Sequence, residues 1–331
     1  MNQLTTNQQR TKQRVNDEMQ SSHLKSDGSV SAIIQTPAHY ISGVYKMELK
    51  YPATQHTQIA SRRPQDAGFY YLARCYENSS DWSIYLRRPL FIADRVFLHS
   101  QASGETSLAE SGAIQEEVLT VIIPENSDPG YLWLQNQRQG TSINLIGPFG
   151  TPFTLPPNRK NLLIITELAM ANLYRSVIEQ CLDRGGRVSM IVHVEYQHHQ
   201  DVAPEIDQPI YQGFVTQLPV AVELQLIHNE DKSHLKTHQQ IWETIWKPNL
   251  STFLQWADLV YASTDAYLYP LLAAEIRQQR LRLEAGFAQA FVETDLICGV
   301  GACLGCTIQL ADGSLTRACV HGPIFDLTQL G

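Results

Sequence analysis

The sequence predicts an antiparallel β-barrel or sandwich, then an open and mostly parallel α/β sheet, and last a small cysteine-rich domain. Three observations predict this organisation. A length of 331 residues corresponds to about two domains of roughly 150 residues each. The pattern of apolar residues changes after Pro156 and Pro157, and four of the six cysteines fall in the last tenth of the chain. A hydrophobic content of 43% is enough to bury a core, which excludes disorder of the whole chain.

The first folded region is expected at residues 37–155, behind a disordered tail at 1–36 that is rich in Gln, Ser, Thr and Asn. Short apolar stretches alternate there with Gly, Pro, Asn and Asp, as in a small antiparallel barrel or sandwich. The expected strands are 44–49, 69–75, 82–86, 119–123 and 143–146.

The second region, at residues 156–284, has the pattern of βαβ units. An apolar run at 161–166 is followed by helical spacing at 170–182, by Gly185 and Gly186, and by a β-branched run at 188–194. Further strands are expected at 222–227 and 259–262, with a helix at 267–279. Such alternation predicts an open parallel sheet with helical crossovers.

Composition excludes several function classes. A formal net charge of -8 argues against nucleic-acid binding, which requires clustered Lys and Arg to neutralise phosphates. The sequence shows no apolar run near the roughly 20 residues that span a bilayer. The polar, Gln-rich start differs from a secretory signal. We therefore expect a cytoplasmic protein whose cysteines are not a disulfide framework.

The main chemical signal is the spacing Cys298-x4-Cys303-x2-Cys306-x12-Cys319. The first three cysteines have the spacing of plant-type ferredoxins, which bind a 2Fe-2S cluster. The small residues Gly299, Gly301, Ala302 and Gly305 lie between them, so the loop can wrap tightly and bring backbone N–H groups near sulfur. A structural zinc site and a cluster of inert thiols are the alternatives, although zinc sites usually contain two separated C-x2-C pairs.

The segment CGVGACLGCTIQLADGSLTRACVHGPIFD, at 298–326, resembles the cluster domain of the dihydroorotate dehydrogenase electron transfer subunit, in the ferredoxin reductase superfamily. LRRPLFIA, at 86–93, resembles the Arg-Arg-Pro flavin segment of that family, and INLIGPFGTPFTL, at 143–155, resembles the junction between its barrel and its nucleotide domain. The resemblance covers residues 37–331. It implies a flavin-binding barrel, a nucleotide domain at 156–284 and a 2Fe-2S domain at 285–331.

The same resemblance implies which residues bind the cofactors and what the partner is. Cys298, Cys303, Cys306 and Cys319 would bind the cluster. Segment 88–91 (Arg88, Pro89, Leu90, Phe91) and Gly130 would bind FAD. Electrons would pass between the chain and a flavin-containing catalytic subunit of the dihydroorotate dehydrogenase type, in pyrimidine biosynthesis.

The sequence departs from the family at both nucleotide sites. Phe91 stands where the flavin motif has Ser, and segment 127–130 stands where the family has Gly-x-Gly-Thr. Thr166 and Glu167 begin the segment that replaces a glycine turn, and Met170 replaces a further Gly. Segment 263–265 replaces Cys-Gly-Pro. Side chains and a carboxylate at a pyrophosphate site oppose binding, so we expect ordinary NAD binding to be lost.

Three functions therefore stay open: an electron-transfer subunit with cluster and FAD, a paralogue that keeps only the cluster as carrier, sensor or assembly subunit, and a reductase subunit of another flavin system. Other residues are expected to have structural roles. His193, His198 and His199 are not expected to bind metal. His321 is expected to face a partner or, alternatively, to lie over the cluster and tune its potential, and in neither case to be a ligand. The aromatic residues Trp242, Trp246, Phe253 and Trp256, and the lone Cys75 and Cys181, are expected in the core.

Overall fold

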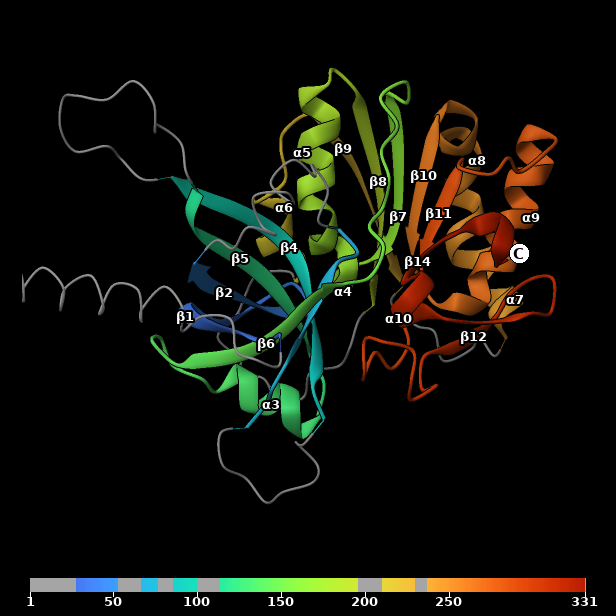
Figure 1. The fold of residues 1–331 in the computed structure, drawn as a ribbon. Coiled ribbons are helices and arrows are strands. Elements are labelled where there is room, and N and C mark those ends of the chain that lie inside the picture. Colours follow the sequence, from blue (N-terminus) through green and yellow to red (C-terminus); the bar gives the residue numbers. More distant parts are fainter. Residues whose placement is uncertain are drawn as a thin grey trace, which may run out of the picture.

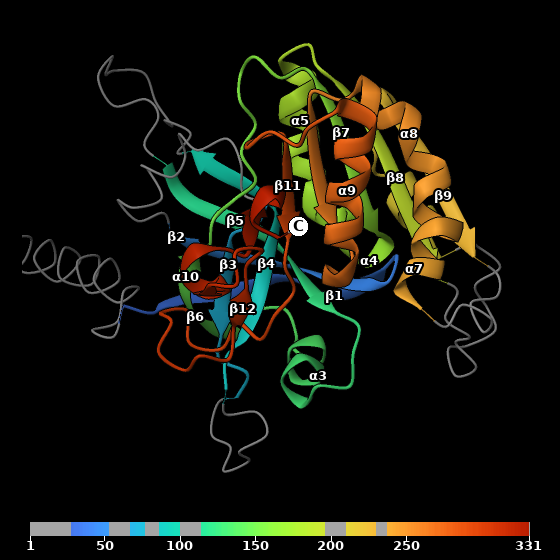
Figure 2. The same cartoon turned by 90° about the vertical axis from the view of Figure 1, so that its right-hand side faces the viewer.

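The protein folds into a closed barrel, a six-stranded sheet with helices on both faces, and a small C-terminal hairpin region beside them (Figures 1 and 2). The computed structural model describes residues 28–52, 67–76, 86–99, 114–195, 210–229 and 237–330. The N-terminal half of the chain contains the barrel, and the C-terminus lies on the far side of the α/β sheet from the barrel, beside helix α9 (Tyr269–Arg280) in Figure 1.

The barrel has the strand order β1-β2-β5-β4-β3-β6, and every neighbouring pair is antiparallel. Alternate side chains point inward, and Ile34, Met47, Leu90 and Val121 are among the fully buried residues of its core. The strands are β1 (Val30–Ile41), β2 (Val44–Pro52), β3 (Tyr70–Ala73), β4 (Arg88–His99), β5 (Ile114–Pro124) and β6 (Ser142–Phe149).

The barrel alternative is thus confirmed over the sandwich, because β1 pairs with both β2 and β6 and closes the sheet. β1 begins at Val30, inside the segment expected as tail. The reason is that Ala32 and Ile34 are fully buried in the barrel core. Residues 1–27 lie outside the described residues, as does most of the expected strand 82–86.

The α/β region contains the sheet β14-β11-β10-β7-β8-β9, which is parallel except for β14. The four expected strands are present as β7 (Asn161–Glu167), β8 (Arg187–Glu195), β9 (Val222–Asn229) and β10 (Leu259–Ser263). The sheet also contains β11 (Ala288–Phe291) and the antiparallel edge strand β14 (Ile324–Asp326), which the sequence did not predict.

Two helical layers cover the sheet. Alternate residues of β7 divide between them: Leu163 and Ile165 pack in one core, while Leu162 and Ile164 pack in the other. α4 (Leu168–Ala171) and α5 (Arg175–Asp183) belong to the face nearer the barrel. α7 (His238–Ile241), α8 (Lys247–Trp256) and α9 (Tyr269–Arg280) cover the other face, and α6 (Gln212–Val215) precedes β9.

The aromatic residues of 242–256 confirm the expectation of core packing. Trp242 and Trp246 are buried, and Phe253 and Trp256 pack against the same core. Cys75 and Cys181 are buried free thiols, also as expected. No helix of the described part of the chain has the length and apolar character required to cross a membrane.

The C-terminal region is an insertion between two neighbouring strands. β11 and β14 pair with each other. The chain between them forms a loop that contains Cys298, Cys303 and Cys306 (residues 298–306, the cysteine loop), followed by β12 (Thr307–Gln309), β13 (Leu315–Arg317) and α10 (Ala318–His321). Thr151, just after β6, donates its backbone N–H to the Gly322 carbonyl (2.7 Å) and its hydroxyl to the Ile324 carbonyl (3.1 Å). The cysteine region is therefore hydrogen-bonded both to the segment that follows β6 and to the α/β sheet. The sequence predicted a separate domain from residue 285.

Candidate functional site

The cysteine loop folds tightly because two of its glycines have conformations that other residues rarely adopt. Gly299 and Gly301 have φ values of +70° and +73°. A Cβ atom on Gly299 would lie 2.9 Å from the ring of Phe149, so the loop approaches the barrel junction at that point. The short segment therefore turns back on itself beside β6.

The four thiols of the motif form two neighbouring pairs. The Cys303 thiol hydrogen-bonds to Cys298, and the backbone N–H of Cys319 donates to Cys306 Sγ (3.5 Å). The backbone N–H of Gly301 donates to Cys319 Sγ (3.2 Å) and links the two pairs. Cys306 and Cys319 are buried, whereas Cys303 is exposed. The set of four cysteines is therefore open to solvent on the side of Cys303.

The two pairs have different electrostatic surroundings. Burial raises the pKa of Cys298, but hydrogen bonds from the backbone of Cys303 and Val300 outweigh this effect and lower the pKa to about 6. Burial and the hydrogen bond with Cys306 raise the pKa of Cys319 to about 12. A bound metal deprotonates its thiol ligands, so metal charge would hold Cys319 as a thiolate despite its raised pKa.

This arrangement fits a 2Fe-2S cluster better than one zinc ion. A cluster of this type takes four thiolates shared between two irons, which suits thiols arranged in pairs. In the described part of the chain, no three His, Cys, Asp or Glu side chains converge on one point, so the preference for the cluster rests on the pairing of the thiols. His321 points to Thr316, with 3.0 Å between Nδ1 and the hydroxyl, and is not grouped with the thiols.

A buried hydroxyl beside the thiols also fits a bound cluster. Tyr70 is fully buried in the same core as Cys306 and Cys319, and its hydroxyl has no hydrogen-bond partner among the described residues. Burial raises the pKa of Tyr70, and the nearby Cys319, Cys306 and Cys298 thiols raise it further. A buried donor without an acceptor is costly, and cluster sulfur is an acceptor.

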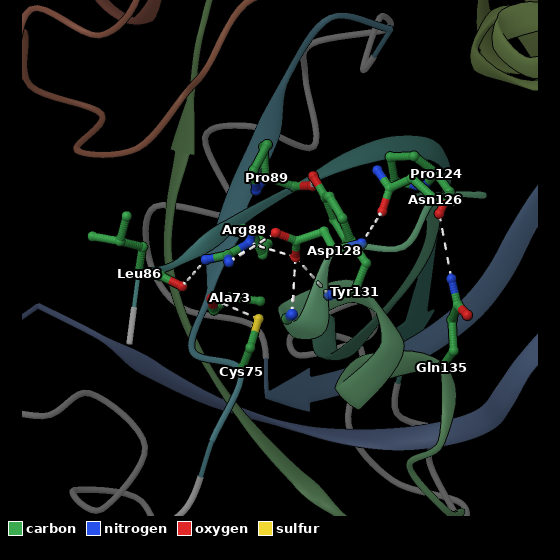
Figure 3. Close-up of polar contacts among 11 residues, drawn as sticks. Ala73, Cys75, Leu86, Arg88, Pro89, Pro124, Asn126, Asp128, Tyr131 and Gln135 are labelled. Atoms are coloured by element: carbon green, nitrogen blue, oxygen red, sulfur yellow. Dashed lines mark hydrogen bonds and ion pairs between the residues drawn. The ribbon is translucent and has the colours of Figure 1, made fainter. Parts of the chain in front are cut away.

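A cavity of about 720 Å³ lies next to the cysteine loop, between the start of β4, the start of helix α3 (Pro129–Gln135) and the segment that leads into the loop. Figure 3 shows polar contacts among several of its lining residues and their neighbours. Its lining includes Arg87, Arg88, Phe91, Asp128, Glu293 and Gly305. Of the residues expected to bind FAD, Arg88, Pro89 and Phe91 line this cavity, whereas Leu90 and Gly130 are not part of its lining.

Arg88 is already paired within the chain. Its Nε lies 2.7 Å from Asp128 Oδ1, and its Nη2 lies 2.9 Å from Asp128 Oδ2 (Figure 3). The same Asp128 carboxylate caps α3, because Oδ1 accepts the backbone N–H groups of Gly130 (2.9 Å) and Tyr131 (3.0 Å). Gly130 is needed for this contact, since a Cβ atom there would lie 2.9 Å from Arg88 Nε.

The other residues of segment 88–91 that are expected to bind the flavin make packing and hydrogen-bond contacts within the protein. Leu90 is fully buried in the barrel core, and the Pro89 carbonyl accepts the Tyr131 hydroxyl (3.2 Å). Phe91 packs between the barrel and the sheet, with its ring centroid 5.1 Å from that of Phe291 and 5.5 Å from that of Tyr70. An aromatic side chain therefore fills the space where the resemblance implies a smaller hydroxyl residue.

These residues do not fit the diphosphate of FAD. Arg87 donates to the carbonyls of Leu72 (3.0 Å) and Asn144 (3.1 Å), so both arginines of the cavity are engaged. Burial raises the pKa of Glu293, and Asp265 and Asp295 raise it further, which shows that acidic groups gather at this side of the cavity. A diphosphate would have to displace Asp128 and approach carboxylates.

The usual nucleotide crevice of such a sheet lies at the carboxyl ends of strands where the strand order reverses. Here β7 and β10 are joined at that point by a network of hydroxyls: Ser263 Oγ lies 2.7 Å from Thr166 Oγ1 and accepts the Tyr174 hydroxyl at 2.8 Å. Glu167 Oε2 lies 2.6 Å from Nδ1 of the buried His193. Side chains that are hydrogen-bonded to each other therefore occupy the turn where nucleotide-binding sheets have glycines that let the pyrophosphate approach the backbone. His198 and His199 lie outside the described residues.

Two features of the site are missed by reading the motifs alone. Asp128 could have been found from its place before Pro129, because an acidic N-cap followed by Pro is a common helix start. Tyr70 carries no such local signal. Its closeness to the thiols depends on the barrel strand β3 lying beside the insertion between β11 and β14.

Comparisons with known proteins agree with this architecture. Residues 293–331 match the family model for the iron-sulfur cluster binding domain of dihydroorotate dehydrogenase B. A similar solved structure is that of NADH-dependent reduced ferredoxin-NADP oxidoreductase, with 13% identity, 90% of this chain and 88% of that chain covered, and a TM-score of 0.54. Phthalate dioxygenase reductase is also similar, with 13% identity, 90% and 78% coverage, and a TM-score of 0.48. A search of curated protein sequences finds no significant match.

The resemblance read from the sequence is thus confirmed in the C-terminal domain and in the fold: a six-stranded barrel, an α/β sheet and a small iron-sulfur region, as in ferredoxin reductases. At such low identity the likeness to the solved structures concerns the fold alone.

Proposed function

We propose, from an iron-sulfur cluster binding domain of the dihydroorotate dehydrogenase B family on a ferredoxin reductase fold, that this protein is an electron-transfer subunit. Cys298, Cys303, Cys306 and Cys319 would hold a 2Fe-2S cluster, which supplies one-electron transfer when bound. The observation that carries the proposal is the pairing of four thiols, three on the cysteine loop and Cys319 on α10, with backbone N–H groups donated to their sulfurs. The partner would be a flavin-containing catalytic subunit of the dihydroorotate dehydrogenase type, in pyrimidine biosynthesis.

The surface around the thiols supports a docking role. Four large apolar side chains are exposed on the cysteine loop, the hairpin and α10, and Cys303 lies exposed among them. They are Val300 (66% exposed), Leu304 (61%), Leu315 (71%) and Val320 (45%). Several exposed apolar residues on one small region are typical of an interaction surface. A partner bound there would bring its own redox centre close to Cys303.

A second candidate is a subunit that keeps only the cluster. The Arg88–Asp128 pair and the Phe91–Phe291 contact favour it, because they occupy groups and space that FAD would need. A partner from another flavin system is compatible with the same docking surface.

The partner is tested by mixing the oxidised protein with dihydroorotate and a dihydroorotate-oxidising flavoprotein under anaerobic conditions. Bleaching of the visible cluster absorption is the expected result. An intact cluster that is reduced by dithionite but stays oxidised in this mixture would refute the dihydroorotate-type partner and leave the other flavin systems.

The docking surface gives a separate prediction. Leu304→Lys and Leu315→Lys are expected to slow reduction by the partner about tenfold or more, because each places a charge in an apolar interface centre. The visible spectrum of the cluster should not change. Val220→Lys is the matched control, since Val220 is fully exposed on the α/β region, away from the thiols. Equal slowing in all three variants would contradict docking at the cysteine loop.

Tyr70→Phe is expected to make the midpoint potential of the cluster more negative, because a hydrogen bond to cluster sulfur favours the reduced, more negative state. Potentiometric titration followed by electron paramagnetic resonance measures this effect independently of turnover. Tyr71→Phe, a neighbouring residue in the same strand, is the control. An unchanged potential in Tyr70→Phe would show that Tyr70 only packs.

A further inference from the structure

The carboxylate of Asp128 sits in a set of donors that would suit a phosphate. Arg88 gives it two parallel contacts of 2.7 and 2.9 Å, and the first turn of α3 gives it two backbone N–H groups. A planar guanidinium with N–H groups at a helix start is a common way to hold an anionic oxygen group. Here the anion belongs to the protein itself.

The pairing is built into the local structure. Gly130 leaves room for the Arg88 guanidinium against the start of α3, and Pro129 begins the helix without an N–H group to satisfy. Partial burial raises the pKa of Asp128, but Arg88 and the N–H of Tyr131 outweigh this and lower the pKa. The Asp128 carboxylate is therefore ionised at neutral pH and remains a permanent partner for Arg88.

The remaining surfaces of the cavity give a diphosphate no substitute site. Arg87 is engaged by Leu72 and Asn144, and the other charged side chains of the described lining, Glu293 and Asp295, are acidic. The place of a flavin ring is also restricted, because Phe91 contacts both Tyr70 and Phe291. Charge thus opposes the diphosphate of FAD, and shape independently opposes its isoalloxazine ring.

We infer that Asp128 is a built-in anion that takes the place of a ligand diphosphate, so that this chain carries no FAD. The inference rests on the proposed electron-transfer function and refines it: electrons would pass between the cysteine-held cluster and the partner with no flavin stage inside this subunit. Arg88 then has a structural role, although it lies in the segment that resembles a flavin motif.

Asp128→Asn provides the test. Asparagine keeps an N-cap oxygen of the same shape but removes the charge that neutralises Arg88. FAD and ADP, which share the diphosphate, are each titrated into the anaerobically purified full-length protein by calorimetry. Binding of both by the wild type should be too weak to measure, and Asp128→Asn should bind ADP at least about tenfold more tightly than the detection limit of the titration, the scale of one charge-assisted hydrogen bond.

Two further variants complete the design. Glu179→Gln removes the same charge from the exposed surface of α5 and should leave binding unchanged. Adding Arg88→Gln to Asp128→Asn should abolish the gain. If Asp128→Asn folds poorly by circular dichroism, Asp128→Ser keeps a capping hydroxyl and replaces it.

Stoichiometric FAD in the purified wild type would overturn the inference, and so would the absence of any gain in a folded Asp128 variant. Iron and sulfide analysis of the same samples keeps the two proposals apart. Missing iron and sulfide with a normal ADP gain would refute the proposed cluster function while leaving the built-in anion in place.

Discussion

Replacing Cys319 with serine is expected to abolish the cluster, with loss of the visible absorption and of the bound iron. Cys319 is buried, contacts Cys306 through its backbone, and receives the N–H of Gly301. A serine hydroxyl binds iron less well than a thiolate, and its shorter side chain cannot take the same position. Electron transfer to the partner should then stop, because no other group of the site carries single electrons. Absorption spectra and iron analysis after anaerobic purification measure the effect.

Cys181→Ser is the matched control for this substitution. Cys181 is a buried free thiol of α5, and the structure gives it only weak contacts to the carbonyls of Lys160 and Arg187. The exchange of sulfur for oxygen is the same, so any general cost of burying serine appears in both variants. Full iron content in Cys319→Ser, or equal loss in Cys181→Ser, would contradict the assignment of Cys319 as a ligand.

The second large effect concerns a buried ion pair inside the barrel. Arg95 Nη1 on β4 lies 2.6 Å from Glu117 Oε1 on β5, and the two side chains are only 4% and 0% exposed. Removal of one member of a buried pair typically costs about 3–5 kcal/mol, because the remaining charge stays away from water. Arg95→Met is therefore expected to lower the free energy of unfolding by about that amount. Urea denaturation followed by circular dichroism provides the measurement.

A neighbouring pair on the outer face of the barrel is the control. Lys50 Nζ lies 2.7 Å from Glu116 Oε2, but these side chains are 38% and 43% exposed. Lys50→Met should cost under about 1 kcal/mol, as is usual for exposed pairs. The double variant Arg95→Met with Glu117→Leu should recover most of the stability, because no unpaired charge remains. Equal effects at the two pairs would show that burial does not govern the cost.

Local patterns in the sequence are enough to predict most elements of the fold. Period-two apolar residues predict β-strands such as 119–123, and the break at Pro156 and Pro157 marks the change to parallel strands. Two boundaries depend on distant pairing. Val30 joins the barrel because β6 lies beside it, and residues after 285 share the α/β sheet because β14 pairs with β11. Neither pairing leaves a local signal.

The candidate site divides in the same way. The four proposed cluster ligands lie within 22 residues of one another, so their spacing alone predicts the chemistry. Arg88 and Asp128 are 40 residues apart, and only the closed barrel brings β4 next to α3. The sequence motif therefore predicts that Arg88 binds the FAD diphosphate, whereas in the folded chain Arg88 forms an ion pair with Asp128. The departures from the family motif at Phe91 and at 127–130 indicate that the flavin site is altered, but they do not predict the ion pair between Arg88 and Asp128.

The most direct test of the account is analysis of iron, acid-labile sulfide, zinc and released flavin in one sample of protein purified without oxygen. We expect two irons and two sulfides per chain, a rhombic electron paramagnetic resonance signal after reduction, and no flavin. One zinc ion per chain with no sulfide would contradict the proposed electron-transfer function, because the four cysteines would then form a structural zinc site without a redox-active group.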